Sequence, residues 1–210
     1  MKEVFTIGYA GFEINEFIRV LKEYKINSLI DVRSNPISKF YEEYNQKNLE
    51  KLLSSTGMIY RNYRKEFGAR QEDKKYYKNG YLDFNLYTQS NNFLEGIRKI
   101  EAGTKSNYTF VFMCAEKDPS TCHRNIMVAR EFYKLGYDVK NIRSDGSYES
   151  QESIEKRLVE RYFPDRNQLT LFSESISWQQ MVKRSYDLRN SEIGYRIDEE
   201  AEVNWCEFAN

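Results

Sequence analysis

Residues 108–114 read Tyr-Thr-Phe-Val-Phe-Met-Cys and form the most strongly apolar run of the 210-residue chain. A short run of this kind, rich in β-branched and aromatic residues, is typical of a central β-strand buried on both faces. The polar segment 115–121 follows it, and Cys122-His123-Arg124 then begins an amphipathic helix that ends at Gly136. We therefore expect a strand–loop–helix unit with the only histidine of the chain in the first turn of its helix.

The same alternation of short apolar runs and longer helical periods continues on both sides of this unit. It predicts strands over residues 4–7, 26–32, 58–60 and 137–142, and helices over residues 12–24, 48–55, 84–102 and 153–162. Such alternation predicts an α/β fold, a doubly wound and mostly parallel sheet of about five strands with helices on both faces. We place this domain at residues 1–145, and a C-terminal helix followed by a polar, acidic extension at residues 146–210.

The amino-acid composition limits the classes of function that are open to this protein. Lys and Arg number 32 and Asp and Glu number 32, so the net charge is zero and any binding of nucleic acid must use a local patch. No apolar run is long enough to span a membrane, so no membrane partner is expected. The chain starts directly in a strand pattern, without a signal peptide, and three cysteines do not make a disulfide framework. These features predict a cytoplasmic protein.

In an open parallel sheet, ligands bind beyond the carboxyl ends of the strands. The segments expected there also hold most of the polar and reactive residues, which predicts a single site at that edge. The candidate catalytic residues are Asp31, Cys114, Glu116, Cys122 and His123. The candidate residues for binding an anion or substrate are Gly8, Tyr9, Arg33, Ser38 and Arg124.

The segment from Cys114 to Arg124 carries the strongest signal for chemistry. Ser120 or Thr121 is expected to cap the following helix. A helix N-terminus beside an arginine binds anions and lowers the pKa of a nearby thiol. The alternative is that Cys114 is only a small buried residue and that His123 and Arg124 form a surface pair.

The Asp31-Val32-Arg33 segment ends a predicted strand. We expect its carboxylate and its guanidinium on opposite faces of the sheet edge, with one of them reaching the site together with Ser38. The alternative is structural, with Asp31 bonded to loop amides and Arg33 held in an ion pair.

Several cofactor and enzyme classes fit the sequence poorly. Structural zinc sites contain ligand pairs spaced about two to four residues apart, whereas Cys114 lies eight residues before Cys122, which His123 follows directly, and Cys206 lies near the end of the chain. Gly8-Tyr9-Ala10-Gly11 is not a dinucleotide fingerprint. We therefore predict no metal and no cofactor. A cysteine phosphatase or sulfurtransferase loop stays a minor alternative, because the first arginine after Cys114 is Arg124 and the loop between them has no glycine.

Residues 60–81 interleave basic and aromatic side chains. Cations on phosphates with rings stacked on bases are typical of nucleic-acid binding. The candidate patch consists of Arg61, Arg64, Arg70, Lys74 and Lys75. The alternative is a solvated loop whose rings pack back on the domain.

Motifs along residues 4–145 resemble the family called domain of unknown function 488. They are Thr6-Ile7-Gly8-Tyr9, Asp31-Val32-Arg33 followed by Pro36 and Ser38, Phe67-Gly68, and Cys114-Ala115-Glu116 with Cys122-His123-Arg124. The resemblance implies an α/β domain found mainly in bacteria and archaea, and it implies no reaction. One departure is Glu66-Phe67-Gly68-Ala69, where the family usually has a Leu-Gly-Gly-type turn.

Two functional hypotheses follow. The first is an enzyme that acts on a nucleotide, a nucleic-acid base or another anionic substrate, with a wider role in DNA processing or repair. Glu116 or Asp31 would then transfer protons and Cys114 or Cys122 would be the nucleophile. The second is a non-catalytic, nucleic-acid-associated binding module that uses residues 60–81. An enzyme should show a closed pocket that joins Glu116, Arg33 and His123, whereas a binding module should show a flat basic surface and leave His123 and Cys114 packed away.

A partner is suggested by residues 168–172, Gln-Leu-Thr-Leu-Phe, which match the pattern of the bacterial sliding-clamp-binding pentapeptide. Leu171 and Phe172 would fill an apolar pocket of the clamp, with Leu169 beside them and Gln168 hydrogen-bonded at the rim. The alternative is that Leu169, Leu171 and Phe172 cover an exposed edge of the core of this same domain.

Overall fold

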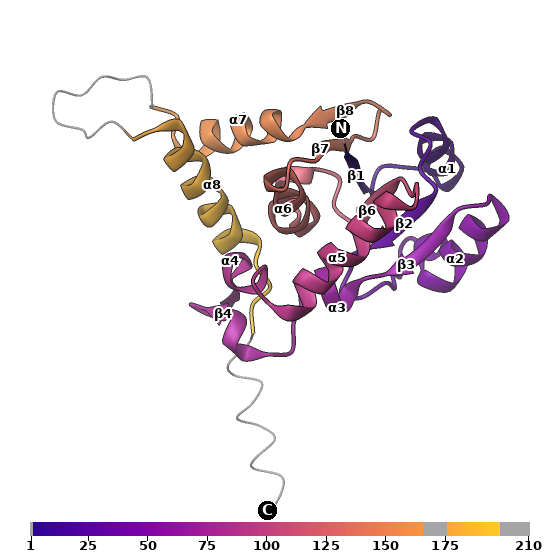
Figure 1. Ribbon diagram of the computed structural model, residues 1–210, viewed down its shortest axis with the longest axis horizontal. Coiled ribbons are helices and arrows are strands. Elements are labelled where there is room, and N and C mark those ends of the chain that lie inside the picture. Colours follow the sequence, from indigo (N-terminus) through magenta and orange to yellow (C-terminus); the bar gives the residue numbers. More distant parts are fainter. Residues whose placement is uncertain (1, 166–175, 198–210) are drawn as a thin grey trace, which may run out of the picture.

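A six-stranded sheet organises the residues that the structure, a computed structural model, describes, namely 2–165 and 176–197 (Figure 1). The strand order is β3-β2-β6-β1-β7-β8. The strands are β1 (Glu3–Gly8), β2 (Ser28–Asp31), β3 (Ile59–Asn62), β6 (Phe110–Cys114), β7 (Asp138–Ile142) and β8 (Tyr148–Ser150). The five strands from β3 to β7 in this order pair in parallel, and β8 pairs antiparallel with β7. The predicted α/β class is confirmed, and β8 is a strand that the sequence did not predict.

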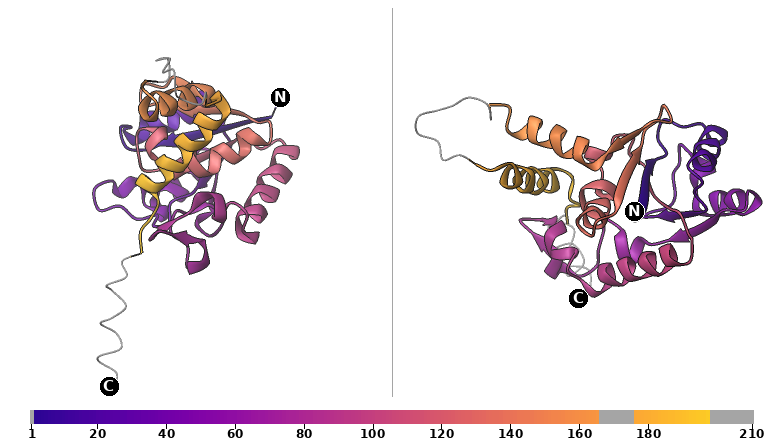
Figure 2. Two further views of the ribbon diagram at one scale, coloured as in Figure 1. Left: turned by 90° about the vertical axis from the view of Figure 1, so that its left-hand side faces the viewer. Right: turned by 45° about the horizontal axis from the view of Figure 1, so that its top comes forward.

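Helices cover both faces of this sheet (Figure 2). Helices α1 (Ile14–Glu23) and α2 (Gln46–Ser55) lie on one face. Helices α5 (Asn91–Lys105), α6 (Arg130–Lys134) and α7 (Gln151–Tyr162) lie on the other. Strand β6 shows why its sequence is apolar throughout. Val111 and Met113 join the core under α1 and α2, whereas Phe110, Phe112 and Cys114 join the core under α5 and α6.

Shorter elements connect these layers. They are α3 (Arg64–Phe67), α4 (Phe84–Tyr87), the hairpin of β4 (Tyr77–Lys78) and β5 (Tyr81–Leu82), the 3-10 turns Glu42–Tyr44, Lys74–Tyr76 and Pro119–Thr121, and the π-helix η4 (Arg124–Ala129). The single helix predicted over residues 84–102 is wrong, because the chain forms α4 and then restarts as α5. Ser90 causes the restart, since its side chain accepts a hydrogen bond from the amide of Phe93 at 3.1 Å and so caps α5.

Helix α8 (Trp178–Ile193) lies beyond Pro164, where the sequence showed no strong period. A capping box between Ser177 and Gln180 starts it. It docks partly through polar groups, because the Asn190 side chain accepts from the amide of Phe84 at 2.8 Å and donates to the carbonyl of Leu82 at 2.9 Å. This polar contact explains why an apolar period did not reveal α8. The clamp-like pentapeptide and the acidic end lie outside the described residues.

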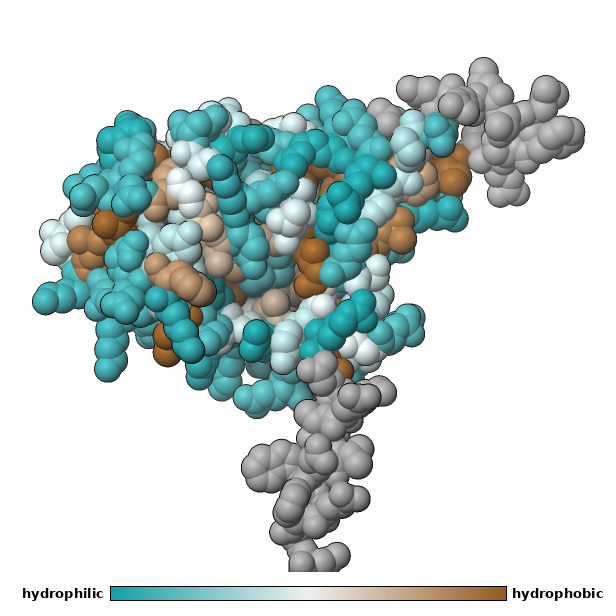
Figure 3. Space-filling view, turned by 180° about the vertical axis from the view of Figure 1, so that it is seen from behind, coloured by the Kyte–Doolittle hydropathy of each residue, from teal (hydrophilic) through white to brown (hydrophobic). Residues whose placement is uncertain are grey.

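In the face shown in Figure 3, hydrophilic residues dominate and the hydrophobic patches are small and separate. In the part of the chain that the structure describes, the helices are all too short or too polar to cross a membrane.

A buried polar network ties the C-terminal helices to the sheet. The Asn125 side-chain amide donates to Asn141 and to Gln151, each at 2.8 Å. Gln151 in turn donates to the hydroxyl of Tyr186 on α8 at 2.7 Å, and Thr6 on β1 donates to Asn141 at 2.8 Å. Because η4, β1, β7, α7 and α8 all contribute, the network fixes how these elements meet.

Replacing Asn125 by Ala should therefore lower the free energy of unfolding by about 3 kcal/mol, since Asn141 and Gln151 would lose buried hydrogen-bond partners. Urea denaturation followed by circular dichroism measures the change. The control is Asn92→Ala at an exposed position of α5, which should change stability by less than about 0.5 kcal/mol. Equal effects of the two substitutions would contradict the importance of the network.

Candidate functional site

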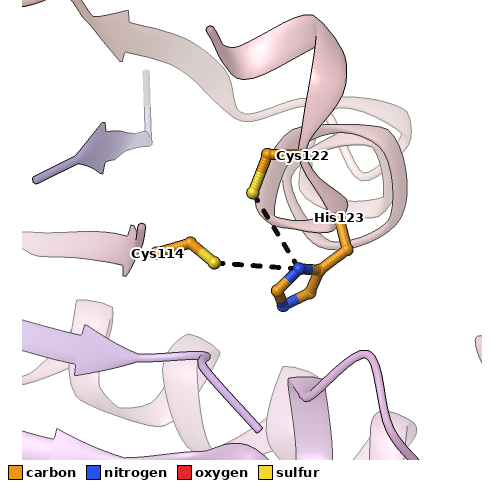
Figure 4. Close-up of side chains that lie close together, drawn as sticks. All are labelled: Cys114, Cys122 and His123. Carbon is orange, nitrogen blue, oxygen red and sulfur yellow. Dashed lines mark hydrogen bonds between the residues drawn. The ribbon is translucent and has the colours of Figure 1, made fainter. Parts of the chain in front are cut away.

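Three potential ligand side chains converge beyond the carboxyl end of β6 (Figure 4). Cys114 is the last residue of β6, and Cys122 and His123 directly precede η4. The two sulfurs and one ring nitrogen all lie within 4.8 Å of one another. The three residues are 3 %, 1 % and 8 % exposed, respectively. The structure thus brings together three of the predicted catalytic residues and buries all of them.

His123 is oriented by the neighbouring strand. Its Nε2 lies 2.9 Å from the carbonyl oxygen of Val32, just past the end of β2. A carbonyl oxygen can only accept, so Nε2 carries the proton and donates it. The amide of Val32 donates to the carbonyl of Met113 at 3.1 Å, which fixes this segment to β6. Nδ1 therefore faces the two cysteines, 3.8 Å from Cys114 Sγ and 3.9 Å from Cys122 Sγ.

Cys122 is the most enclosed member of the cluster. Its sulfur accepts from the amide of Arg124 at 3.4 Å and shares a hydrogen bond with Glu116 Oε2 at 2.9 Å. The prediction that Ser120 or Thr121 caps this helix is wrong. Asp118 instead caps the preceding 3-10 turn by accepting from the amide of Ser120, and His123, the N-cap residue of η4, makes no side-chain cap hydrogen bond.

A fully buried arginine holds the backbone that carries Glu116. Arg124 Nη1 donates to the carbonyl of Glu116 at 2.6 Å, and Nη2 donates to that of Lys117 at 3.4 Å. Gly8 allows this close packing, because a Cβ there would lie only 1.8 Å from the Glu116 carbonyl oxygen. Arg124 is therefore not part of a surface pair. It acts as a buried clamp on the loop, and its Nε has no hydrogen-bond partner among the described residues.

The ionisable groups of the cluster, together with burial, shift one another's pKa values. Burial opposes ionisation of Cys122, but the hydrogen bond from Cys114 and the charges of Arg124 and His123 lower the pKa of the Cys122 thiol well below its usual value. The hydrogen bond to Cys122, together with burial, raises the pKa of Cys114. Burial and the charge of Cys122 raise the pKa of Glu116. Burial would lower the pKa of His123, but Cys122 outweighs it and raises that pKa. Perturbed groups so closely packed are typical of functional sites.

Glu116 is the member of this group that reaches the surface. The residue is exposed, whereas Cys114, Cys122, His123 and Arg124 are buried. Its carboxyl oxygen is nevertheless held against Cys122. An external molecule therefore meets Glu116 before it meets either thiol.

Asp31 and Arg33 form a separate buried ion pair, with 2.6 Å between Arg33 Nη2 and Asp31 Oδ2. Asp31 also accepts from the Arg33 amide at 3.0 Å and from the Tyr60 hydroxyl at 2.7 Å. The expectation of opposite faces is wrong, because side chains two positions apart in an extended segment lie on the same face. The pair does not join the thiol cluster, but Val32 between its members bonds to His123.

Tyr9 and Ser38 also lie outside the thiol cluster. Tyr9 stacks on Tyr44 with 4.4 Å between ring centroids, and the Arg33 guanidinium lies 5.2 Å from the centroid of Tyr9. Ser38 Oγ accepts from the amides of Phe40 and Tyr41 and so shapes its own loop. The predicted single site therefore divides into the thiol cluster and the Asp31–Arg33 pair with its aromatic neighbours.

The predicted basic patch is exposed at all five positions, Arg61, Arg64, Arg70, Lys74 and Lys75. Arg64, Arg70 and Lys75 line one groove together with the acidic residues Glu66, Glu72 and Asp73. Asp73 pairs with Lys75 at 2.6 Å. The groove is thus of mixed charge.

The carbonyl of Val32 is the contact that sequence reasoning missed. A main-chain group has no signature in a sequence. The sequence did hold part of this information. In an extended strand Asp31 and Arg33 lie on the same face and Val32 lies on the other, so the alternation of the strand predicts the Asp31–Arg33 pair.

Removing the charge of Asp31 should destabilise the fold strongly. Asp31→Asn leaves Arg33 buried without its partner, so the free energy of unfolding should fall by about 3–5 kcal/mol. The matched control is Asp187→Asn, which removes a surface pair with Lys183 and should cost less than about 1 kcal/mol. Thermal and urea unfolding of both variants measure this. A loss as small as that of the control would show that the pair is not structural.

Similarity to a known family covers the larger part of the chain. The family described as "Domain of unknown function DUF488" matches residues 13–130, which is more than half of the 210 residues. No curated protein and no solved structure matches the chain. The matched range includes β2, β6 and every residue of the thiol cluster. The chain belongs to the DUF488 family.

Proposed function

We propose that the protein is an enzyme that acts on an anionic substrate, such as a nucleotide or a nucleic-acid base, with Glu116 as its proton-transfer group. One observation carries this proposal. Glu116 is exposed, yet its carboxyl oxygen is held 2.9 Å from the buried sulfur of Cys122. A carboxyl group that is fixed in place on an exposed residue is suited to general acid–base catalysis.

The surrounding residues support a substrate of negative charge. Lys117 is exposed directly beside Glu116, and the buried guanidinium of Arg124 lies behind the same loop. Arg33, in contrast, is neutralised by Asp31. The positive charge that acts on the Glu116 carboxyl is that of His123, with Lys117 next to Glu116 in the chain and Arg124 behind the loop.

Hydrolysis is the reaction type that this arrangement suits. Glu116 would take a proton from a water molecule as the oxygen of that water bonds to the electrophilic atom of the substrate. It would return the proton to the leaving group as the bond to that group breaks. Direct attack by Cys114 or Cys122 is disfavoured, because the thiols are 3 % and 1 % exposed.

Glu116→Gln should reduce turnover about a hundredfold or more and change Tm by less than about 2 °C, since the side chain lies at the surface. The assay incubates purified protein with a panel of nucleosides and nucleoside phosphates and detects products by mass spectrometry. Glu95→Gln removes an exposed pair with Arg98 and is the matched control. Full activity of Glu116→Gln, no turnover by the wild type, or a large drop in Tm for this variant alone would each contradict the proposal.

A nucleic-acid-binding module is the second candidate. The burial of His123 and Cys114 favours it, because a binding module does not need these side chains at its surface. The exposed cations of residues 60–81 would make the contact. A role at replicating or repaired DNA would further require residues 168–172 to bind the sliding clamp, which stays a prediction.

Binding to a DNA or RNA probe should weaken steeply with salt if this second candidate is correct. Replacing Arg61, Arg64, Lys74 and Lys75 together by Ala should reduce the slope of log Kd against log salt by roughly one for each of these cations that binds a phosphate. Fluorescence anisotropy at several salt concentrations measures the slope. Binding that does not depend on salt, or no binding at all, would exclude the module.

A further inference from the structure

The sulfurs of Cys114 and Cys122 and the Nδ1 of His123 converge on one point from two elements, the end of β6 and the start of η4 (Figure 4). A tetrahedral zinc ion, with Zn–S of about 2.3 Å and Zn–N of about 2.0–2.1 Å, keeps its sulfur and nitrogen ligands roughly 3.6 Å apart. The observed distances are 3.8 Å and 3.9 Å. The two nitrogen–sulfur distances would therefore need to contract by only a few tenths of an ångström, and all three atoms lie within 4.8 Å of one another.

The ring of His123 is already oriented for such a role. Histidines that bind metals commonly donate their other ring N–H to a carbonyl or carboxylate, which fixes the tautomer and aims the free nitrogen. His123 does this with the carbonyl of Val32 at 2.9 Å. The Val32 segment is itself anchored to β6 and flanked by the buried Asp31–Arg33 pair. The orientation of Nδ1 thus follows from the sheet and does not depend on the cysteines.

We propose that Cys114, Cys122 and His123 bind a zinc ion. Two thiolates and one imidazole are a donor set that suits zinc, whereas magnesium and calcium prefer oxygen ligands. The two thiolates would also neutralise the two positive charges of the ion. The spacing of Cys114 and Cys122 in the sequence argued against a metal site. The fold removes that objection, because it places the end of β6 against the start of η4.

The site would be of the open type. Structural zinc sites have four protein ligands, whereas catalytic sites have three and leave one position for water or substrate. Glu116, whose carboxyl oxygen contacts Cys122, would then be the group that transfers a proton at that position. This last step rests on the proposed function, while zinc binding itself does not.

Metal content tests the proposal directly. The full chain is purified under reducing conditions without chelators, and zinc per chain is measured by inductively coupled plasma mass spectrometry. We expect about one zinc ion per chain in the wild type and less than about a tenth of that in Cys114→Ser and Cys122→Ser. Cys206→Ser is the matched control, since Cys206 is not one of the three proposed ligands, and it should keep its zinc.

A second measurement does not depend on the folding of variants. Chelator-treated wild-type protein is titrated with Co²⁺, and thiolate ligation should appear as strong near-ultraviolet charge-transfer absorption that saturates at about one ion per chain. Zinc should then displace the cobalt. Absence of both zinc and the cobalt band, iron or copper in place of zinc, or a Cys114–Cys122 disulfide in the native protein would overturn the proposal.

The zinc proposal and the proposed function can fail separately. Zinc bound at the three ligands together with full activity of Glu116→Gln would keep the metal site and reject the role of Glu116. Loss of activity in Glu116→Gln without any bound zinc would keep the role of Glu116 and reject the metal site.

Discussion

The hydrogen bond between His123 and the carbonyl of Val32 is the interaction on which the candidate site depends. It joins the end of β2 to the start of η4 and decides which ring nitrogen faces the cysteines. The Asp31–Arg33 pair keeps the backbone of Val32 in place, and Val32 is also bonded to β6. A buried ion pair of this kind contributes little net stability over apolar residues of the same size. Its value here lies in fixing the direction of one carbonyl group.

The architecture places reactive groups where a parallel sheet usually holds its ligands, beyond the carboxyl ends of the central strands. Strand β6 is buried on both faces, so Cys114 is presented at a rigid position. Cys122 and His123, which face Cys114, directly precede the π-helix η4, and π-helices occur frequently at functional sites. Gly8 and Arg124 then hold the loop that carries Glu116. The sheet and the start of η4 therefore hold the thiol cluster, and packed, hydrogen-bonded backbone holds Glu116.

The sequence predicted the class of fold and the five parallel strands, because apolar runs such as 108–114 record burial on both faces. It missed β8, and it missed α8, which docks partly through polar groups such as Asn190. It also predicted the residue types of the site but not their grouping. The register between β2 and β6 decides which carbonyl His123 contacts and whether Cys114 and Cys122 converge. No local sequence pattern encodes that register.

The central claim is that the sheet orients one histidine nitrogen and two sulfurs around a common point. X-ray absorption at the zinc edge of the purified protein tests this most directly. We predict a coordination shell with two sulfur atoms at about 2.3 Å and at least one nitrogen at about 2.0–2.1 Å. A shell made only of nitrogen and oxygen would contradict the account, because any bound zinc would then lie away from Cys114 and Cys122.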